Sequence, residues 1–513
     1  MRLPIVNPIT RTKKQEGVFG GLDTRSSVQD GYFADMKNMS SDYYPAAGPR
    51  QARGESIKTL ETPNGLYWKN GLAYVDGEKL YYKEQEKGTL TDGKKVMVGM
   101  GAYIIIFPDK VYLNTDSGEF GSMEKSFIQA STATFAPSYT GSTYTKISCT
   151  GIGKQFNQYD GVEISGCTNA DYNKTATIQA KTDDSITIIG VLENSFTQAS
   201  GLKVKRKVPD MDFLTECENR LWGCSSKNHE VYASKLGDPL NWNVFEGIST
   251  DSYAATIGSD GDFTAAATYS GYALFFKEHT IHKVFGNKPS NIQIQTQEAP
   301  GVKNGCSGSV QVVGTTLIYL SGTGVYGYTG GVPFALSDVL EKLTLSDGIA
   351  GKYQGKYYLS AETGKGKQLL VYDTAKRLWH KEDDTQMLLA APGGGQLYYV
   401  DQDKNVRTIT GGDELVEWYL ETGDLEEGSL NRKYIGKIQF MIELERGSQV
   451  DVFLKHDSDA AFRRMITIFA DKKRTYSIPI KPMRCFYYRW RLEGKGKARL
   501  IAVGKYINEG SEI

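Results

Sequence analysis

Two histidines three residues apart, His279 and His282, form the first pair in this sequence whose types and spacing suit chemistry. On a helix, two imidazoles at that spacing can ligate one metal ion. Residues 272–286 instead alternate apolar and polar side chains like a strand, which directs the two rings to opposite faces. We therefore interpret both as solvent-tolerant strand residues and predict no metal site. The other histidines stand alone, with no carboxylate or thiol at ligand spacing: His229, His380 and His456.

Four other short patterns resemble functional loops but are better explained as turns. Residues 364–367 and 494–497 alternate Gly and Lys, yet they lack the GxxxxGK[ST] spacing and the following helix of a phosphate-binding loop. The acidic turns at residues 76–79 and 259–262 lack the final glutamate of a calcium-binding loop. The many acids are too scattered to assign the carboxyl pair of a glycosidase. We predict no catalytic, cofactor-binding or metal-binding residues, and a protein that is not an enzyme.

The composition places these residues on an all-β scaffold. The chain has 56 Gly and 32 Tyr in 513 residues, which suits short strands joined by tight turns, and its length suggests two or three folding units. Helix signals are sparse, and the one short helix expected spans residues 333–345. Six scattered cysteines without a CxxC pair predict buried free thiols in a reducing cytoplasm.

The overall charge and hydropathy exclude several partners. Lys plus Arg and Asp plus Glu are 60 each, so the net charge gives no general attraction to nucleic acid or to an anionic membrane. No apolar run has the length of a signal peptide or a membrane span. We expect a soluble protein that does not bind membranes and is not exported by the usual signals.

A unit of three short strands separated by tight turns recurs along most of the chain. Each unit alternates apolar and polar residues between Gly, Asn or Asp turns, which is typical of hairpins. The seven candidate units are residues 64–84, 96–115, 216–235, 264–286, 309–331, 348–381 and 388–411. Because a small sheet buries both faces only against its neighbours, several such sheets must close into a ring. We predict a β-propeller of six or seven blades.

Shifts in composition divide the chain into four parts. Residues 1–54 form an arm with little periodicity, which we expect to lie on another subunit or domain because it cannot bury a face of its own. The propeller takes residues 55–125 and 210–415. It is interrupted by residues 126–209, which we predict to form an inserted small β-barrel-like domain. Residues 416–513 contain longer strands and predict a C-terminal β-sandwich, which would act as a platform.

The C-terminal segment is strongly basic. Residues 431–513 carry 18 Lys plus Arg against 9 Asp plus Glu, and the remainder of the chain is equally negative. Its stretches RKYIGK, FRRM, DKKR and RCFYYRWR mix basic and aromatic residues, as nucleic-acid-binding surfaces do. Alternation, however, places Arg489 and Arg491 on one face of a strand and Tyr488 and Trp490 on the other, which is ordinary for a sandwich. We favour a charged contact between subunits over sequence-specific nucleic-acid binding.

One stretch, residues 217–245, resembles the tail-nozzle (tail tubular protein B-like) and packaged-DNA stabilisation proteins of tailed bacteriophages. The shared pattern is Asn-Arg-Leu-Trp, Val-Tyr-Ala-Ser, Gly-Asp-Pro and Asn-Trp. Here it consists of Asn219, Arg220, Leu221, Trp222, Val231, Tyr232, Ala233, Ser234, Gly237, Asp238, Pro239, Asn241 and Trp242. We call these residues the blade motif. In physical terms, Asp-Pro sets a turn after a strand, and the two tryptophans fill space between blades. Residues 19–25, 35–54, 274–286 and 307–331 have the same texture.

The resemblance implies a structural virion protein of the phage tail, assembled in the host cytoplasm. Such proteins form rings, commonly hexamers, that extend the DNA channel as a nozzle or hub, retain packaged DNA and take part in its ejection. The implied partners are other copies in a homo-oligomeric ring, a portal-adaptor or upper tail ring protein, tail fibres, and double-stranded DNA that passes without sequence-specific binding. No cofactor is implied.

The alternative function is a carbohydrate-binding or carbohydrate-cleaving β-propeller. Aromatic-rich blade ends offer stacking platforms for sugar rings. The missing signal peptide and the lack of an assigned acid pair count against this alternative. An intracellular scaffold of the WD type is excluded more simply, because the Gly-His and Trp-Asp signature is absent.

Overall fold

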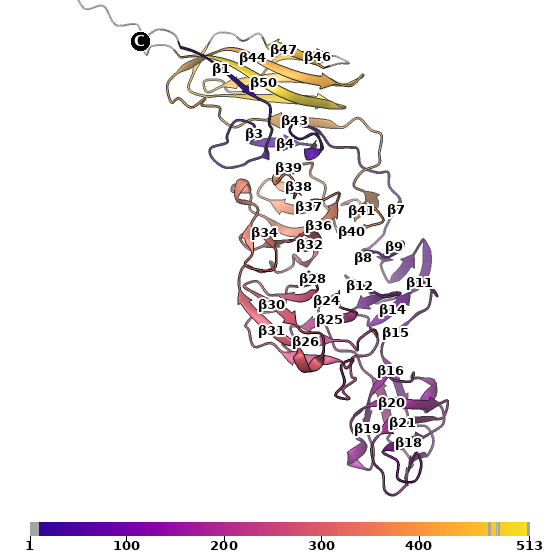
Figure 1. The fold of residues 1–513 in the computed structure, drawn as a ribbon. Coiled ribbons are helices and arrows are strands. Elements are labelled where there is room, and N and C mark those ends of the chain that lie inside the picture. Colours follow the sequence, from indigo (N-terminus) through magenta and orange to yellow (C-terminus); the bar gives the residue numbers. More distant parts are fainter. Residues whose placement is uncertain (1–9, 470–472, 479, 481–482, 510–513) are drawn as a thin grey trace, which may run out of the picture. The chain divides into compact units, whose positions relative to one another are not determined.

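The computed structural model is built almost entirely of strands and describes residues 10–469, 473–478, 480 and 483–509 (Figure 1). The chain packs into two compact units. Unit 1 comprises Met1–Thr59, Gln311–Thr329 and Pro333–Ile513, and unit 2 comprises Leu60–Val310 and Gly330–Val332. Within the described residues, seven four-stranded antiparallel sheets follow one another along the chain, four in unit 2 and three in unit 1. The predicted all-β fold with a β-propeller is confirmed, and the described residues contain seven sheets of the blade type.

The four propeller sheets of unit 2 are short meanders. Their strands are β8 (Pro63–Trp68), β9 (Leu72–Asp76), β10 (Lys79–Tyr82) and β11 (Gln85–Thr89); β12 (Val96–Met100), β13 (Tyr103–Phe107), β14 (Val111–Asn114) and β15 (Phe120–Ser122); β24 (Phe213–Cys217), β25 (Arg220–Ser225), β26 (Glu230–Ala233) and β27 (Tyr253–Thr256); and β28 (Ala265–Tyr269), β29 (Tyr272–Phe276), β30 (Thr280–Phe285) and β31 (Gln293–Glu298). The tight turn between β8 and β9 uses Asn70 and Gly71, which both have positive φ. The first strands contact one another in the order β8, β12, β24, β28, and apolar side chains are buried between each successive pair of sheets.

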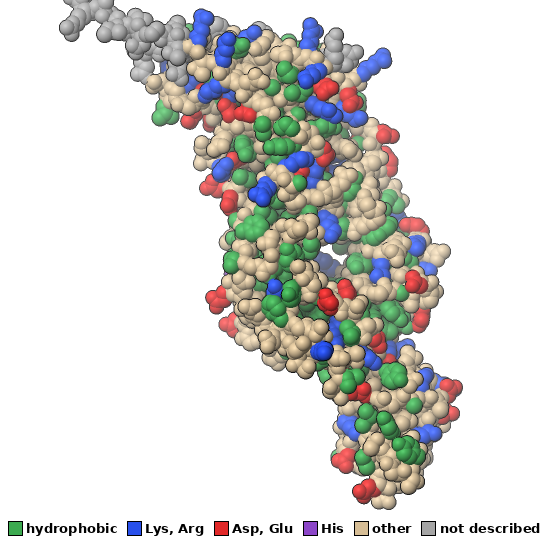
Figure 2. Space-filling view, in the orientation of Figure 1, with side chains coloured by type: hydrophobic (Ala, Val, Ile, Leu, Met, Phe, Trp, Pro, Cys, Tyr) green, Lys and Arg blue, Asp and Glu red, His purple; other side chains and the backbone are tan. Residues whose placement is uncertain are grey.

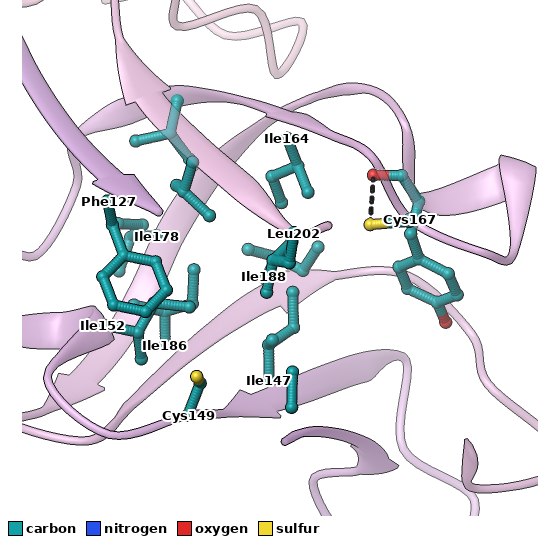
Figure 3. Packing of buried hydrophobic residues seen from close by; sticks show 14 of the residues in the cluster. Phe127, Ile147, Cys149, Ile152, Ile164, Cys167, Ile178, Ile186, Ile188 and Leu202 are labelled. Carbon is teal, nitrogen blue, oxygen red and sulfur yellow. Dashed lines mark hydrogen bonds between the residues drawn. The ribbon is translucent and has the colours of Figure 1, made fainter. Parts of the chain in front are cut away.

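The inserted domain is an eight-stranded sheet in the order β16-β23-β19-β20-β21-β18-β17-β22. Its elements are β16 (Lys125–Ile128), β17 (Ala133–Pro137), β18 (Tyr144–Ser148), η2 (Ile152–Lys154), β19 (Gly161–Ser165), η3 (Ala170–Tyr172), β20 (Thr175–Thr182), β21 (Ser185–Ile189), β22 (Phe196–Gln198) and β23 (Lys203–Arg206). The two end strands β16 and β22 do not pair, so the sheet is barrel-like without being closed. Isoleucines from several strands, among them Ile147, Ile164 and Ile186, fill its centre (Figure 3).

The three propeller sheets of unit 1 include one that takes a strand from the beginning of the chain. The first two are β32 (Gln311–Val313), β33 (Thr316–Ser321), β34 (Gly324–Tyr328) and β35 (Phe334–Ala335), and β36 (Ser346–Tyr353), β37 (Lys356–Thr363), β38 (Gly366–Asp373) and β39 (Leu378–Lys381). The third is β40 (Leu389–Gly393), β41 (Gln396–Val400), β42 (Asn405–Thr408) and β7 (Lys58–Thr59). The outermost strand β7 therefore fastens this sheet to the arm.

The predicted helix at residues 333–345 was wrong. The segment holds strand β35 and one turn of 3-10 helix, η6 (Asp338–Leu340). The backbone N–H of Thr24, in the arm, donates a 2.7 Å hydrogen bond to the carbonyl of Val339. A longer α-helix would need that carbonyl for its own ladder, so the contact with the arm outweighs the local helical pattern.

The C-terminal sandwich has two sheets. One contains β1 (Thr10–Glu16), β50 (Ala498–Glu509), β44 (Lys433–Leu444) and β47 (Arg474–Ile478), with β48 (Arg484–Cys485) beside β44. The other contains β4 (Asp35–Lys37), β43 (Glu417–Glu421), β49 (Tyr488–Lys495), β45 (Gln449–His456) and β46 (Arg463–Phe469). Phe440 and Trp490 meet between the sheets with ring centroids 5.2 Å apart. Tyr488 and Trp490 are buried whereas Arg489 and Arg491 are not, as alternation predicts, and the DKKR stretch lies partly outside the described residues.

The N-terminal arm lies on the sandwich of its own chain. Besides β1 and β4 it forms β2 (Gly21–Leu22), β3 (Tyr32–Phe33), β5 (Met39–Ser40), η1 (Ser41–Tyr43) and β6 (Gly48–Pro49). Phe19, Phe33 and Met36 are buried there. The remaining single turns are η4 (Pro289–Asn291) and η5 (Ser307–Ser309). All six cysteines are buried free thiols. Among the described residues, no helix has the length and apolar character needed to cross a membrane.

Candidate functional site

The blade motif starts with an arginine that holds a long loop. Arg220 begins β25 and is buried. Its guanidinium donates hydrogen bonds to the carbonyls of Ser234, Asp251 and Ser249 at 2.7, 2.6 and 2.8 Å. These carbonyls belong to the connection between β26 and β27, so one side chain organises the 19 residues of that loop, 234–252. Burial disfavours the charged form and lowers the pKa of Arg220.

The second half of the motif ties this loop to the inserted domain. The side-chain amide of Asn241 donates one hydrogen bond to Asp238 at 2.5 Å and another to Asp160 at 3.1 Å. Its side-chain oxygen Oδ1 accepts a hydrogen bond from the backbone N–H of Gly161 at 3.0 Å. Asp160 in turn pairs with Arg206 at 2.9 Å, and both side chains are almost fully buried. We call Asp160, Arg206 and Asn241 the junction triad, because it joins the third propeller sheet to the inserted domain.

The two motif tryptophans fill two successive spaces between sheets. Trp242 packs with residues of the second and third sheets, among them Phe107 and Leu221. Trp222 packs with residues of the third and fourth sheets, among them Phe275. The other members of the motif complete turns or strands: Asn219, Val231, Ala233, Gly237 and Pro239. Glycine is required at position 237 because its φ is +75°.

A polar pocket of about 650 Å³ lies where the inserted domain meets the propeller sheets of unit 2. The inserted sheet contributes β16, β19 and β23, and the propeller contributes the end of β26. The lining residues are Lys110, Glu124, Lys125, Ser126, Glu163, Lys205, Arg206, Lys207, Val208, Pro209, Asp210, Asn228, Tyr232 and Asn243. Tyr232 and Arg206 connect this pocket with the blade motif and the junction triad.

Lys110 is the electrostatic centre of the pocket. Its ammonium contacts Asp210 at 2.7 Å and Glu124 at 3.1 Å, and it donates to the carbonyl of Val208 at 2.7 Å. Burial opposes its charge, but the hydrogen bonds to the two carboxylates outweigh burial and raise the pKa of Lys110. The same contact lowers the pKa of Asp210. Asp210 is therefore an ionised hydrogen-bond acceptor at neutral pH, and it is a weaker base than an ordinary carboxylate.

Neutral hydrogen-bonding groups complete the pocket. Burial raises the pKa of Tyr232 to about 12, and a hydrogen bond to Glu230 adds to this effect, so the phenol keeps its proton. Asn228 donates to the Tyr232 oxygen at 2.9 Å. Lys207 and Glu163 form a partly exposed ion pair. Planar polar side chains around a concave surface are the groups that bind the hydroxyls of a polar ligand.

These pocket residues were not found from the sequence. They come from separate places in the chain, at residues 110, 124–126, 163, 205–210, 228, 232 and 243, and the insertion brings them together. The one available signal was the basic run Lys205, Arg206 and Lys207 followed by Pro209 and Asp210. It stands where the inserted domain ends.

The histidine pair does not form a site. His279 is exposed just before β30, whereas His282 is buried within it. The interpretation of both as solvent-tolerant was wrong for His282. Its ring nitrogens contact the hydroxyls of Thr296 at 2.9 Å and Ser259 at 3.0 Å, which satisfy it in the core. Residues 364–367 lie at a hairpin turn between β37 and β38, as expected. The same expectation was wrong for residues 494–497, which connect β49 of one sandwich sheet to β50 of the other. No group of metal-ligating side chains occurs in the part of the chain that the structure describes.

Acid is expected to destabilise unit 2 through His282. Burial lowers the pKa of His282 to about 4 from the ordinary 6.5, with a smaller effect of Lys277. Between those values the unfolded chain binds a proton and the folded chain does not. Stability is therefore complete above pH 6.5 and falls as the pH drops towards 4, by at most about 1.4 kcal/mol per pH unit. Urea unfolding should lose this pH dependence in His282→Gln and keep it in His279→Gln, and an unchanged profile in the first variant would contradict it.

Comparisons with known proteins concern the fold. No protein-family model and no curated protein matches the chain. Among solved structures, it is similar to an exo-beta-1,3-galactanase from Phanerochaete chrysosporium (9% identity, 57% of this chain and 94% of that chain, TM-score 0.22). It is also similar to an arabinoxylan arabinofuranohydrolase from Bacillus subtilis (9% identity, 74% of this chain and 95% of that chain, TM-score 0.21). A third similar structure is the endosialidase of phage phi92 (10% identity, 79% of this chain and 55% of that chain, TM-score 0.16). Likeness at this level shows the fold alone.

The comparisons correct one prediction. We predicted that the protein is not an enzyme, and this is contradicted because glycoside hydrolases are among the solved structures to which the chain is similar. These names correspond to the carbohydrate alternative.

Proposed function

We propose that this chain is a structural subunit of the tail of a tailed bacteriophage, in which several copies form a ring. The observation that carries the proposal is the place of the blade motif, on which the sequence resemblance rests. The hydrogen bonds of Arg220 hold the loop between β26 and β27 in position, and those of Asn241 hold the inserted domain in position. A motif that fixes the arrangement of two domains is expected where copies must present matching surfaces to one another.

In this role the chain extends the DNA channel, retains packaged DNA and takes part in ejection. Its expected partners are other copies of itself, commonly six, an adaptor or upper tail ring, tail fibres, and double-stranded DNA. The proposal is supported by the resemblance to the nozzle family, which rests on residues 19–25, 35–54, 217–245, 274–286 and 307–331. The expected location is the virion, after assembly in the host cytoplasm.

Copy number in purified particles tests this proposal. Quantitative mass spectrometry, normalised to the portal protein, should give a fixed ratio that corresponds to one ring per particle. A sixfold ring would give about half of a twelvefold portal's count. Absence of the chain from purified particles would overturn the proposal, and a variable ratio would contradict a ring of fixed symmetry.

A carbohydrate-binding or carbohydrate-cleaving propeller is the second candidate, and the polar pocket of unit 2 favours it. The pocket offers amides, carboxylates, lysines and a phenol, which together can bind several sugar hydroxyls. Asp210, held ionised by Lys110, can accept hydrogen bonds from sugar hydroxyls.

A glycan array and a reducing-sugar assay test the second candidate. The intact chain should bind or cleave a glycan, and Asn228→Ala with Asn243→Ala should reduce binding at least tenfold. Asn431→Ala, an exposed asparagine in unit 1, serves as the matched control. Binding that both variants retain would place the glycan elsewhere, and no binding and no sugar release would exclude this candidate.

A further inference from the structure

The outer face of one sandwich sheet carries two rows of basic and aromatic side chains. In the first row, Lys13 of β1, Tyr506 of β50 and Lys437 of β44 are cross-strand neighbours. In the second row, Arg11, Asn508, Tyr434 and Arg484 are neighbours in the same way. We call these seven residues the basic face. Figure 2 shows several Lys and Arg side chains along the upper edge of the sandwich, with some Asp and Glu side chains among them.

The tyrosines hold the cations in place. The Lys13 ammonium lies 5.3 Å from the centroid of the Tyr506 ring, and the Lys437 ammonium lies 5.7 Å from the same centroid. The Arg484 guanidinium lies 5.5 Å from the centroid of Tyr434. Cations over tyrosine rings keep their full charge while their side chains are confined. The two rings therefore act as supports for charge, and their faces are not free to stack on bases.

The charges of the basic face are not compensated, in contrast to those on the opposite side of the same sheet. There, Lys14 and Lys505 are both paired with Glu427, at 3.1 and 2.9 Å. Within the described residues, no carboxylate lies within ion-pair distance of Arg11, Lys13, Lys437 or Arg484. The chain thus neutralises the cations that face its interior and leaves four cations exposed together on the outside.

We infer that the basic face binds the phosphate backbone of double-stranded nucleic acid. The two rows are two residues apart on β1 and β50, which is about 7 Å, and three apart on β44, where a β-bulge lies between Ile435 and Lys437. Rows at this separation can contact different phosphates of one DNA strand. Asn508 and the tyrosine hydroxyls add neutral donors of the kind that contact phosphate and sugar. Contacts of this type bind without reading sequence, so this surface differs from the sequence-specific readout that the sequence argued against.

The inference takes its biological setting from the proposed phage-tail function, and it names the surface through which such a subunit contacts DNA. The two can fail separately. DNA binding is measured on the isolated full-length chain, whereas the tail assignment is measured by copy number in particles. A negative result in the DNA-binding experiment does not decide the tail assignment, and a negative copy-number result does not decide DNA binding.

Fluorescence anisotropy with a mixed-sequence DNA duplex of about 30 base pairs tests the inference over a range of salt concentrations. Four phosphate contacts predict a slope of log affinity against log salt of about −3.6. The triple variant Lys13→Gln, Lys437→Gln, Arg484→Gln should bring this slope to about −1, with weaker binding to every sequence. The matched control removes three cations from the other sheet of the sandwich, as Lys455→Gln, Arg464→Gln, Lys495→Gln, and should bind like the unaltered chain.

Three outcomes would overturn the inference. They are no binding at low salt, equal loss in the control variant, and preservation of binding in the triple variant. Poly-glutamate is used as a competitor in parallel. If it displaces DNA and binds the unaltered chain as tightly, with the same dependence on the three cations, the partner is an acidic protein surface and the nucleic-acid inference is wrong. Unchanged circular dichroism spectra establish that each variant is folded.

Discussion

Replacing Arg53 with alanine is expected to lower the free energy of unfolding of unit 1 by about 3–5 kcal/mol. Arg53 closes the N-terminal arm onto the last two propeller sheets of that unit. Its guanidinium contacts Glu382 at 2.6 Å and Asp383 at 3.2 Å, and it donates to the carbonyl of Ile409 at 3.1 Å. All three charged groups are buried or nearly so, so removing the arginine leaves two carboxylates without their main partner in a poorly solvated place.

The same variant should change the response of unit 1 to acid. Burial alone would raise the pKa of Asp383, but the charges of Arg53 and Arg50 outweigh burial and hold it at about 2. The stability that this carboxylate contributes is therefore present above its ordinary pKa of 3.8 and is lost as the pH falls from 3.8 towards 2. Arg53→Ala should have less stability to lose over that interval.

Urea unfolding followed by tryptophan fluorescence measures both effects, because Trp379 is buried in the neighbouring strand β39. Lys37→Ala is the control. It removes a cation on the exposed surface of the arm, and it should cost less than about 1 kcal/mol. A loss below 1 kcal/mol in Arg53→Ala would mean that the arm is not fastened by this cluster.

The repeating sheets could be predicted from the sequence because their determinants are local. Alternating side chains between turns such as Asn70-Gly71 specify a hairpin without reference to distant residues. The fourth strand of the seventh sheet could not be predicted in this way. Strand β7 is only Lys58–Thr59, which has no periodicity, and it exists because Val406 and Asn405 offer an open edge far along the chain.

Where a prediction from the sequence was wrong, a contact with a residue distant in the chain had changed the local structure. The helical pattern at residues 333–345 does not form a helix, because Thr24 of the arm donates a hydrogen bond to the Val339 carbonyl that the helix would need. His282 read as a solvent-tolerant residue, and it is buried because Thr296 lies directly across from it on β31. The pocket around Lys110 was invisible for the same reason, since the inserted domain supplies half of its lining.

Breaking the junction triad should have a comparable effect on unit 2. Arg206→Met is expected to cost about 3–5 kcal/mol, because it leaves Asp160 buried without its cation. The double variant Asp160→Asn, Arg206→Met should recover part of this loss, since it no longer holds an unpaired buried charge. Lys207→Met, at the next residue, removes only a partly exposed pair with Glu163 and should cost less than about 1 kcal/mol.

Hydrogen exchange shows which part of unit 2 loses stability and how large the loss is. The N–H of Gly161 donates to Asn241, and Asn241 donates to Asp160, so loosening Asp160 should speed exchange at Gly161 while strands β28–β31 of the fourth sheet stay protected. This pattern is expected if the blade motif and the inserted domain are held together by one network. If Arg206→Met and Lys207→Met were equally stable, or if exchange rose evenly through unit 2, the triad would not be what joins them. The blade motif would then act through its two tryptophans, which pack between the propeller sheets. The inserted domain would be held only by the contacts around the polar pocket.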